Sequence, residues 1–333
     1  MAGERGPMCT GGGKPVCTGP DRPGYASSMI RLASGAIGLK FDDCLTPQCG
    51  LSSGFSSYFT ESIDEGNTWS APVQITRPGT PANATWMIQT HTGRIVLANE
   101  YAFVTPSTAR HSTMNLCTVF YSDDEGKSWG ESSESLFLFG GAGSRIHSTE
   151  VPCVVEMANG RLLMFMRTEL QRLGQSYSDD DGEHWSEVEL NGLVASHSEV
   201  WLARLPSTDD LLCVWNQVSG EEMARGYYRA RLSSAISHNG GEKWERFRTI
   251  MQSPGMQAVG RIDDHAPPGF FRSGSASPPV GQIHEDGFRS VRAPRVVFVG
   301  DIAYMVYHDR GFDQQGEPTH HTWKLCAMPG SFF

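Results

Sequence analysis

Acidic and basic side chains recur in this sequence where predicted β-strands begin or end. Glu150 begins one apolar run, Arg167 ends the next one and Arg229 precedes another. A carboxyl group in a partly dry site can donate or accept a proton, and paired guanidinium groups can hold a carboxylate through fork-like hydrogen bonds. These residue types therefore point to acid–base chemistry or to the binding of an acidic ligand, provided that the fold brings them together.

A repeated motif indicates what the fold is. Ser, Asp, Gly and Trp recur at fixed offsets in "SIDEGNTW" from Ser62, "SDDEGKSW" from Ser122, "SDDDGEHW" from Ser178 and "SHNGGEKW" from Ser237, so that the serines are 60, 56 and 59 residues apart. We expect each copy to be a tight hairpin in which Ser and Asp cap backbone N–H groups, Gly takes a positive φ and Trp covers the turn. A repeat of about 58 residues suits one four-stranded propeller blade.

Hairpin-like segments of similar pattern fill the intervals between these turns. Five of them are versions of one hairpin: residues 27–41, 86–101, 150–167, 199–216 and 293–309. Residues 251–291 are rich in Gly, Pro and Ser and are predicted to be either a degraded blade or an excursion loop. The sequence therefore predicts an all-β protein, a six-bladed β-propeller over residues 25–333. A Gly/Pro-rich extension over residues 1–24 precedes it and could complete the last blade.

Composition and charge limit the partners. The chain has 333 residues, 39% of them hydrophobic, and a formal net charge of −10, which disfavours a general surface for nucleic acid or anionic membranes. It has no apolar run long enough for a transmembrane helix, and its first residues lack the apolar centre of a signal peptide, so we expect a cytoplasmic protein, with a secreted form as the alternative. The eight cysteines lie mostly in apolar runs and are expected to be buried free thiols. The sequence assigns no metal site and makes no prediction of oligomeric state.

The strand register predicts where polar side chains converge. In each predicted blade, three positions should lie on the face opposite the Ser/Asp/Trp turns. They are the start of the first, inner strand, the end of the second strand and the start of the third strand. The residues at these positions are Asp42, Asp43, Glu100, Tyr101, His111, Glu150, Arg167, Glu169, Asn216, Gln217, Arg229, Arg292, His308 and Asp309. Several ionisable groups at one mouth make a pocket the expected site, although each of them could equally be a solvated rim residue.

The repeats resemble the Asp boxes, or BNR repeats, of the sialidase (neuraminidase) superfamily of six-bladed propellers. More specifically, "TEVPCVVEMANGRLLMFMRT", followed by "SYSDDDGEHW" and "YYRARLSSAISHNGGEKW", resembles the central sialidase blades. The resemblance implies that Glu150 is the carboxylate that partners the nucleophile, and that Arg167 and Arg229 bind the carboxylate of the substrate. Arg225 and Arg231 compete with Arg229 for this assignment.

The sequence departs from the sialidase pattern in two places. Sialidases open the first blade with Phe/Tyr-Arg-Ile-Pro, which provides the first arginine of a triad, whereas this chain has "GYASSMIRL". Arg22 or Arg292 could replace that arginine in space. The family's nucleophile is a tyrosine at the start of the last inner strand, where this chain has "RAP" from Arg292; Tyr304 and Tyr307 are near in sequence but belong to the following strand.

Two classes of function follow from the resemblance. The first is an exo-glycoside hydrolase, sialidase-like, that acts on a terminal carboxylate-bearing sugar. For this class the expected site residues are Glu150 and Asp43 as catalytic groups, with Asp42 as the alternative to Asp43, and Arg167, Arg229, Arg292 and Asn216 as substrate-binding groups. The second class is a non-catalytic glycan-binding or scaffold propeller. Both have a glycan as partner, and neither needs a cofactor, because glycoside hydrolysis uses acid–base groups and water.

Overall fold

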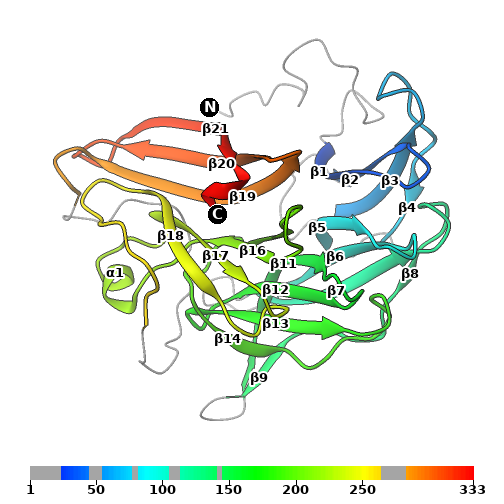
Figure 1. Cartoon of the computed structure of the whole chain (residues 1–333), viewed down its shortest axis with the longest axis horizontal. Helices are drawn as coiled ribbons and strands as arrows, with labels where there is room; N and C mark the ends of the chain where they lie inside the picture. The colour runs from blue at the N-terminus through cyan, green and yellow to red at the C-terminus, as the bar shows by residue number, and fades with distance from the viewer. Residues whose placement is uncertain (1–23, 45–54, 77–81, 105–112, 141–144, 264–282) are drawn as a thin grey trace. The chain divides into compact units, whose positions relative to one another are not determined.

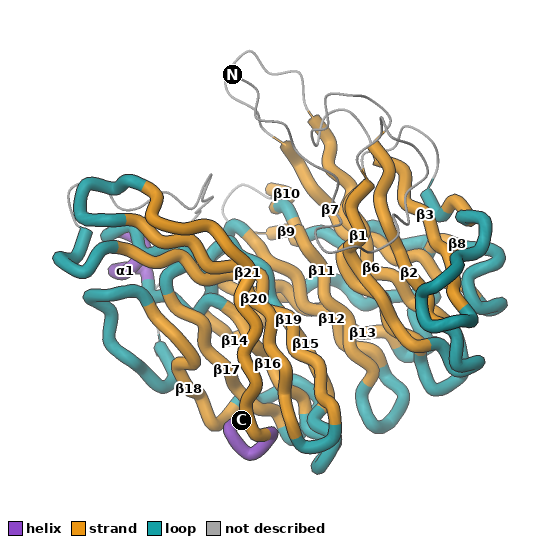
Figure 2. Tube along the Cα trace, turned by 90° about the horizontal axis from the view of Figure 1, so that it is seen from above, coloured by secondary structure: helices purple, strands orange, loops and turns teal. Residues whose placement is uncertain are grey.

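The fold is built almost entirely of β-strands. The computed structural model describes residues 24–44, 55–76, 82–104, 113–140, 145–263 and 283–333. Figure 2 shows that strands dominate the trace; the helical segments among these residues are α1 (Gly220–Ala224) and a 3-10 turn (Gly330–Phe332). The chain divides into two compact units. The first holds the described residues up to Phe137 together with Ser178–Trp185, and the second holds Leu138–Tyr177 and Ser186–Phe333.

The first unit contains two four-stranded antiparallel sheets, each formed in chain order. One sheet consists of β1 (Gly24–Arg31), β2 (Ile37–Cys44), β3 (Phe55–Ser62) and β4 (Val73–Gln74). The other consists of β5 (Ala82–Gln89), β6 (Ile95–Val104), β7 (Thr113–Ser122) and β8 (Gly130–Glu131). Simple up-and-down order within each sheet is the blade pattern that the repeat predicted.

The second unit contains three more sheets of this kind and one short ribbon. The ribbon is β9 (Leu138–Gly140) with β10 (Arg145–His147). The first blade sheet consists of β11 (Thr149–Glu156), β12 (Leu162–Thr168), β13 (Arg172–Ser178) and β14 (Glu189–Val194). The second consists of β15 (Trp201–Arg204), β16 (Leu211–Trp215), β17 (Arg231–Ser237) and β18 (Glu245–Gln252). The third has three strands, β19 (Phe288–Val299), β20 (Ile302–Phe312) and β21 (Pro318–Pro329), coloured orange to red in Figure 1.

The described residues therefore form five blade sheets, and the predicted sixth blade is not among them. The segment predicted as a degraded blade or loop, residues 251–291, contributes the end of β18 and the start of β19, and its described part between these strands forms no further strand. Residues 264–282 and the N-terminal residues 1–23 lie outside the described chain.

The four repeated motifs are hairpin turns between the third and fourth strands of their sheets, as predicted. In each turn the Ser hydroxyl accepts a hydrogen bond of 2.8–2.9 Å from the N–H of the Gly four residues later. The Asp or Asn two residues after that Ser accepts one of 2.8–2.9 Å from a backbone N–H. The four glycines have φ between 84° and 90°, a left-handed conformation that glycine adopts without steric cost.

The motif tryptophans link the turns to the packing between blades. The indole N–H of Trp129, Trp185 and Trp244 donates to the carbonyl of the motif glycine at 3.0–3.1 Å. In the first unit the ring of Trp129 packs on Phe59 of the preceding sheet, with centroids 5.6 Å apart. In the second unit Trp244 packs on Phe165 in the same way, also at 5.6 Å. These two contacts place Trp129 and Trp244 between neighbouring blades.

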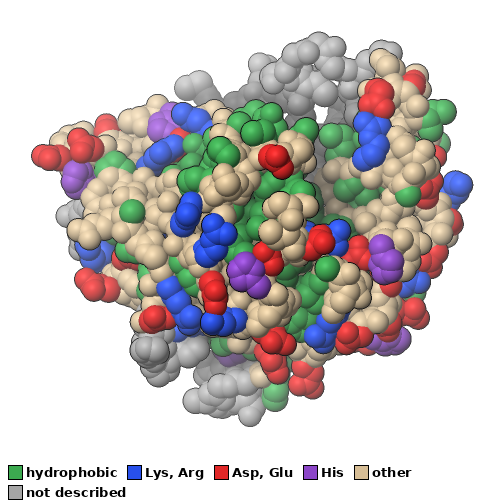
Figure 3. All heavy atoms as spheres, in the orientation of Figure 1, with side chains coloured by type: hydrophobic (Ala, Val, Ile, Leu, Met, Phe, Trp, Pro, Cys, Tyr) green, Lys and Arg blue, Asp and Glu red, His purple; other side chains and the backbone are tan. Residues whose placement is uncertain are grey.

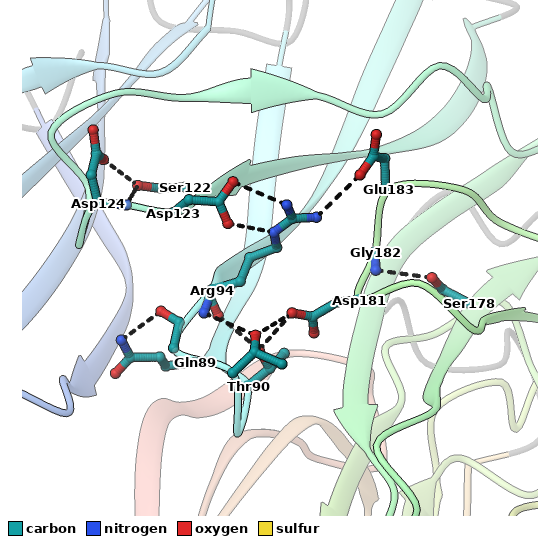
Figure 4. A network of polar contacts seen from close by, with 12 residues as sticks. Gln89, Thr90, Arg94, Ser122, Asp123, Asp124, Ser178, Asp181, Gly182 and Glu183 are labelled. Atoms are coloured by element: carbon teal, nitrogen blue, oxygen red, sulfur yellow. Dashed lines mark hydrogen bonds and ion pairs between the residues drawn. The ribbon is translucent and has the colours of Figure 1, made fainter.

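A polar network in the first unit joins the hairpin between β5 and β6 to the motif turns that follow Ser122 and Ser178 (Figure 4). Arg94 donates to both carboxylate oxygens of Asp123, at 2.6 and 3.0 Å, and lies 3.7 Å from Glu183. The hydroxyl groups of Thr90 and Thr92 both donate to Asp181. The variable positions inside the motif therefore carry contacts between repeats, while Ser, Asp and Gly form the turn itself.

The surface carries charges of both signs. On the face shown in Figure 3, acidic and basic side chains are interspersed. No helix within the described residues is long and apolar enough to cross a bilayer.

Cys117, Cys153 and Cys213 are buried free thiols, as expected from their apolar surroundings.

Candidate functional site

The structure pairs two of the predicted site residues directly. Glu150 on β11 and Arg167 on β12 are opposite each other in the antiparallel ladder. Nε of Arg167 donates to Oε2 of Glu150 at 2.8 Å, and a second guanidinium nitrogen contacts the same oxygen. Glu150 is 1% exposed, so this ion pair lies inside the second unit rather than on its rim.

His197 is a third member of this group and was not predicted. Its Nε2 lies 3.2 Å from the same Oε2 of Glu150. Burial alone would raise the pKa of Glu150, but the hydrogen bond to His197 and the charge of Arg167 outweigh burial and hold this pKa at about 2. Burial lowers the pKa of His197. Glu150 is therefore an anion at any ordinary working pH.

Arg229 joins the group through the backbone of His197. Its Nε and Nη2 donate to the His197 carbonyl oxygen at 3.3 and 2.9 Å, and the residue is 7% exposed. Burial lowers the pKa of Arg229 to about 10, with Arg292 and Arg167 adding to this effect and Glu199 opposing it. Its competitor Arg231 is fully buried and held by Glu222, which favours Arg229 as the site residue.

Glu199 is the second residue that the sequence analysis missed. Burial would raise the pKa of its carboxyl group, but the charges of Arg229, Arg167 and Arg292 outweigh burial and hold the pKa at about 2. The hydroxyl group of Ser198 donates to Glu199 Oε2 at 3.0 Å. A signal was available in the sequence, because Glu-Val opens both the hairpin at Glu150 and the following hairpin at Glu199.

Arg292 reaches this group from β19 beside a distortion of the strand. The β19–β20 ladder shifts register between Arg292 and Arg295, and Ala293 has a φ of 52°. β11 has a similar shift after Glu150, where Val151 has a φ of 47°. A β-bulge re-aims the neighbouring side chain, and a left-handed alanine or β-branched valine is a strained conformation that occurs more often at functional sites.

Asn216 lies next to this group but has a structural bonding pattern. Its amide nitrogen donates to the carbonyl oxygens of Arg231 and Val291, at 2.7 and 2.8 Å. It thereby ties β17 to β19. Asn216 supports β17, which begins two residues after Arg229, and β19, which carries Arg292. Its assignment as a substrate-binding group stays a prediction.

The predicted acid–base residues belong to the first unit. Asp42 is 4% exposed; it forms an ion pair with Lys40 at 2.5 Å and accepts a hydrogen bond from Ser57 at 2.6 Å. Asp43 lies in the β2 backbone ladder opposite Ser56, and its side chain is outside the described part. The assignment of Asp43 as acid–base group therefore stays a prediction.

The other residues that the sequence analysis placed at the predicted mouth contact partners other than Glu150, Arg167 and Arg229. Asp309 binds Arg289 through both carboxylate oxygens, at 2.7 Å each, and the Tyr307 hydroxyl accepts a hydrogen bond from Arg289 at 3.3 Å. Glu169 lies 3.3 Å from His147. The other contacts join Glu100 to Asn115, Tyr101 to Glu131 and Gln217 to the Gly260 carbonyl. His111 lies outside the described residues.

One grouping of potential metal ligands occurs in the described chain. His284, Glu285 and Asp286 place one ligand atom each within 4.8 Å of one another. They are consecutive residues, partly or fully exposed, and exposed acidic groups of this kind are common without a metal ion. They are separate in sequence and bonding from the group formed by Glu150, Arg167, His197, Glu199, Arg229 and Arg292, which we call the arginine cluster.

The comparisons with known proteins agree with this architecture. The family described as BNR repeat-like domain matches residues 44–289. No curated protein matches the chain. Among solved structures, a protein of unknown function from Dyadobacter fermentans is similar at 15% identity with a TM-score of 0.59, covering 94% of this chain and 78% of its own.

Sialidases are also among the similar structures. Trypanosoma rangeli sialidase matches at 12% identity with a TM-score of 0.54, covering 91% of this chain but 44% of its own. The same sialidase in complex with sialic acid matches at 13% identity with a TM-score of 0.53, covering 93% of this chain and 45% of its own. This chain thus spans less than half the length of that enzyme. At these identities the similarity shows the fold, an all-β propeller with Asp-box turns.

Proposed function

Because the chain belongs to the BNR repeat-like domain family, we propose that it is a sialidase-like exo-glycoside hydrolase that acts on a terminal, carboxylate-bearing sugar. The observation that carries this proposal is electrostatic: the charges of Arg229, Arg167 and Arg292 together outweigh the burial of Glu199 and hold the pKa of its carboxyl group at about 2. Three guanidinium groups in a partly buried site are suited to bind a planar anion. Trypanosoma rangeli sialidase binds such an anion in its complex with sialic acid.

The charges of the arginine cluster favour a ligand with one negative charge. Its three guanidinium groups face two carboxylates, Glu150 and Glu199, both of which have a pKa of about 2. The formal balance is one positive charge, which a single sugar carboxylate would neutralise. This supports a monoanionic sugar acid as ligand over a neutral sugar.

The catalytic roles follow from the protonation states. Glu150 is ionised and can stabilise the positive charge that develops on the sugar ring as the glycosidic bond breaks. A separate group must protonate the leaving oxygen, and we assign this role to Asp43. Water is then added to the sugar, so that the products are the free sugar acid and the shortened glycan.

One observation favours the second candidate, a non-catalytic glycan-binding propeller. Arg292 lies within β19, at the position where the sialidase resemblance places a nucleophilic tyrosine. Both carboxylates of the arginine cluster are held ionised, so neither is suited to donate a proton. A protein with these groups alone would bind an acidic sugar and leave the glycosidic bond intact.

Turnover and binding assays on one panel separate the two candidates. The panel consists of a fluorogenic sialoside, a fluorogenic glucuronide and a neutral galactoside, measured with the full chain, with Asp43→Asn and with Glu150→Gln. The hydrolase proposal predicts release from an acidic substrate that is lost in both variants. Binding of the acidic sugars without release would establish the second candidate, and a preference for the galactoside would remove both.

A further inference from the structure

Arg292 donates a hydrogen bond to the imidazole ring of His308. The distance from Nε of Arg292 to Nδ1 of His308 is 3.1 Å, and the two residues are direct partners in the β19–β20 ladder. A guanidinium group has donors but no acceptor. Nδ1 must therefore be the unprotonated nitrogen, and the neutral ring carries its hydrogen on Nε2.

The His308 ring is itself held firmly. It is 6% exposed and packs edge-on against His321, with centroids 4.5 Å apart and an interplanar angle of 75°. On β21, Trp323 is its ladder partner and packs against it at 5.2 Å. These contacts restrict rotation of the ring and so keep Nδ1 directed at Arg292.

Arg292 needs such a support because of where it lies in the strand. The register shift after Arg292 and the φ of 52° at Ala293 interrupt the regular ladder beside it. A long arginine side chain has considerable rotamer entropy to lose on binding a ligand. A fixed acceptor on Nε leaves the terminal nitrogens free to bind a carboxylate and lowers that entropic cost.

We propose that His308 is a positioning residue that holds the Arg292 guanidinium in the arginine cluster, ready to bind the carboxylate of an acidic sugar. The inference rests on the proposed function, since it assigns Arg292 to ligand binding. It adds a residue on a second strand, outside the cluster, on which the cluster's affinity depends.

The surroundings of His308 keep this acceptor available. The charged and titratable groups that act on it are Arg292 on β19, His321 on β21, Asp309 on its own strand and Glu199. Burial lowers the pKa of His308 to about 4, and the charge of Arg292 adds to this effect. Protonation would place a hydrogen on Nδ1 against the Arg292 N–H, so the contact should persist down to about pH 4 and break below it.

A pair of substitutions separates positioning from packing. His308→Phe keeps an aromatic ring against His321 and Trp323 but removes the acceptor, whereas His308→Asn places a carbonyl oxygen near the position of Nδ1. With sialic acid and its methyl ester as probes, we expect H308F to weaken binding of the acid about tenfold and of the ester less than about twofold. H308N should stay within about threefold of the natural protein for both.

A double-mutant cycle makes the dependence on Arg292 explicit. In an Arg292→Ala background, H308F should cause no further loss of sialic acid binding, because the residue acts through Arg292. Equal losses for acid and ester, or the same loss with and without Arg292, would show that His308 is only a packing residue and overturn the proposal.

A spectroscopic measurement tests the contact without any sugar. Long-range ¹H–¹⁵N correlation spectra of the histidine rings at pH 7 should show Nδ1 of His308 as an unprotonated, hydrogen-bonded nitrogen, and R292A should change that signal. A protonated Nδ1, or a signal unchanged in R292A, would overturn the proposal. If the natural protein bound no acidic sugar, the proposed function would fall, and the nitrogen signals alone would then decide whether the His308–Arg292 contact exists.

Discussion

Nε of Arg167 donates a 2.8 Å hydrogen bond to Oε2 of Glu150 across the β11–β12 ladder, in a position where Glu150 is 1% exposed. The pair therefore joins a carboxylate that has lost most of its water to a guanidinium group on a side chain that is 15% exposed. The charge of Arg167 helps to hold the pKa of Glu150 low. Substitution of either residue tests the site and the stability of the sheet together.

Replacing Arg167 should weaken binding of an acidic sugar selectively. Arg167→Gln removes one charged fork, which we expect to cost roughly 1.5–3 kcal/mol in the binding of sialic acid and much less in the binding of its methyl ester. Isothermal titration with both ligands measures the difference. Arg204→Gln, which removes an arginine paired with Asp209 on the surface, is the matched control. Equal losses for acid and ester would make Arg167 a structural residue.

Glu150 should make the protein sensitive to acid. Its pKa is about 2 in the folded protein and its ordinary value is 4.5, so between these values the unfolded state binds more protons than the folded state. Stability from this group is complete above pH 4.5 and is lost as the pH falls toward 2. In urea unfolding, Glu150→Gln should be less stable at pH 7 yet decline less steeply between pH 5 and 2.

Two further variants serve as comparisons for the pH dependence of unfolding of Glu150→Gln. Glu199→Gln should show the same shallower decline, since the pKa of Glu199 is also about 2. Glu187→Gln changes an exposed carboxylate and should follow the natural protein at every pH. If E150Q and the natural protein decline in parallel, Glu150 does not have the low pKa assigned to it.

A methyl group on Gly126 should destabilise the first unit by two separable effects. An added Cβ would lie 2.1 Å from the Phe59 ring, and the residue has a φ of 90°. Gly93 has a φ of 94° with nothing within 4 Å of an added Cβ. Gly93→Ala should therefore cost only the backbone strain, about 1–2 kcal/mol, while Gly126→Ala should cost about 1–3 kcal/mol more through overpacking. Thermal melts of the two variants compare them, and equal shifts would contradict close packing at Gly126.

The motif tryptophans should differ in their contribution to stability according to burial. Trp244 is 6% exposed and packs on Phe165, so Trp244→Ala should cost about 3–5 kcal/mol. Trp129 makes the equivalent contact with Phe59 but is only partly buried, and Trp129→Ala should cost less. Chemical denaturation gives both values. A larger effect at Trp129 would show that burial does not control the contribution of this motif.

Local pattern was enough to predict the blades and their turns. The spacing of Ser, Asp, Gly and Trp determined the hairpin, because its hydrogen bonds join residues only two to four positions apart. The number of blades depended on long-range pairing in a segment with weak strand character, and there the prediction of six is not matched by the five sheets of the described chain.

The site was only partly predictable for a similar reason. Glu150 and Arg167 were found because both ends of one hairpin meet by simple register. His197 and Glu199 were missed because they lie before β15, outside any ladder, and their role depends on charges from Arg229 and Arg292 far along the chain. Local sequence pattern carries little information about which residues distant in the chain come close in the fold.

The bulges of the inner strands have a consequence for how such a site can change. In four of the five blade sheets described, the first strand loses register at an equivalent point, directly after Ala26, Ala84, Glu150 or Arg292. At these points the sequence has an alanine in two of the blades and an ionisable residue in the other two. Because a bulge re-aims the neighbouring side chain, exchange of a single residue there could change ligand preference while the strand pairing of the blade is kept.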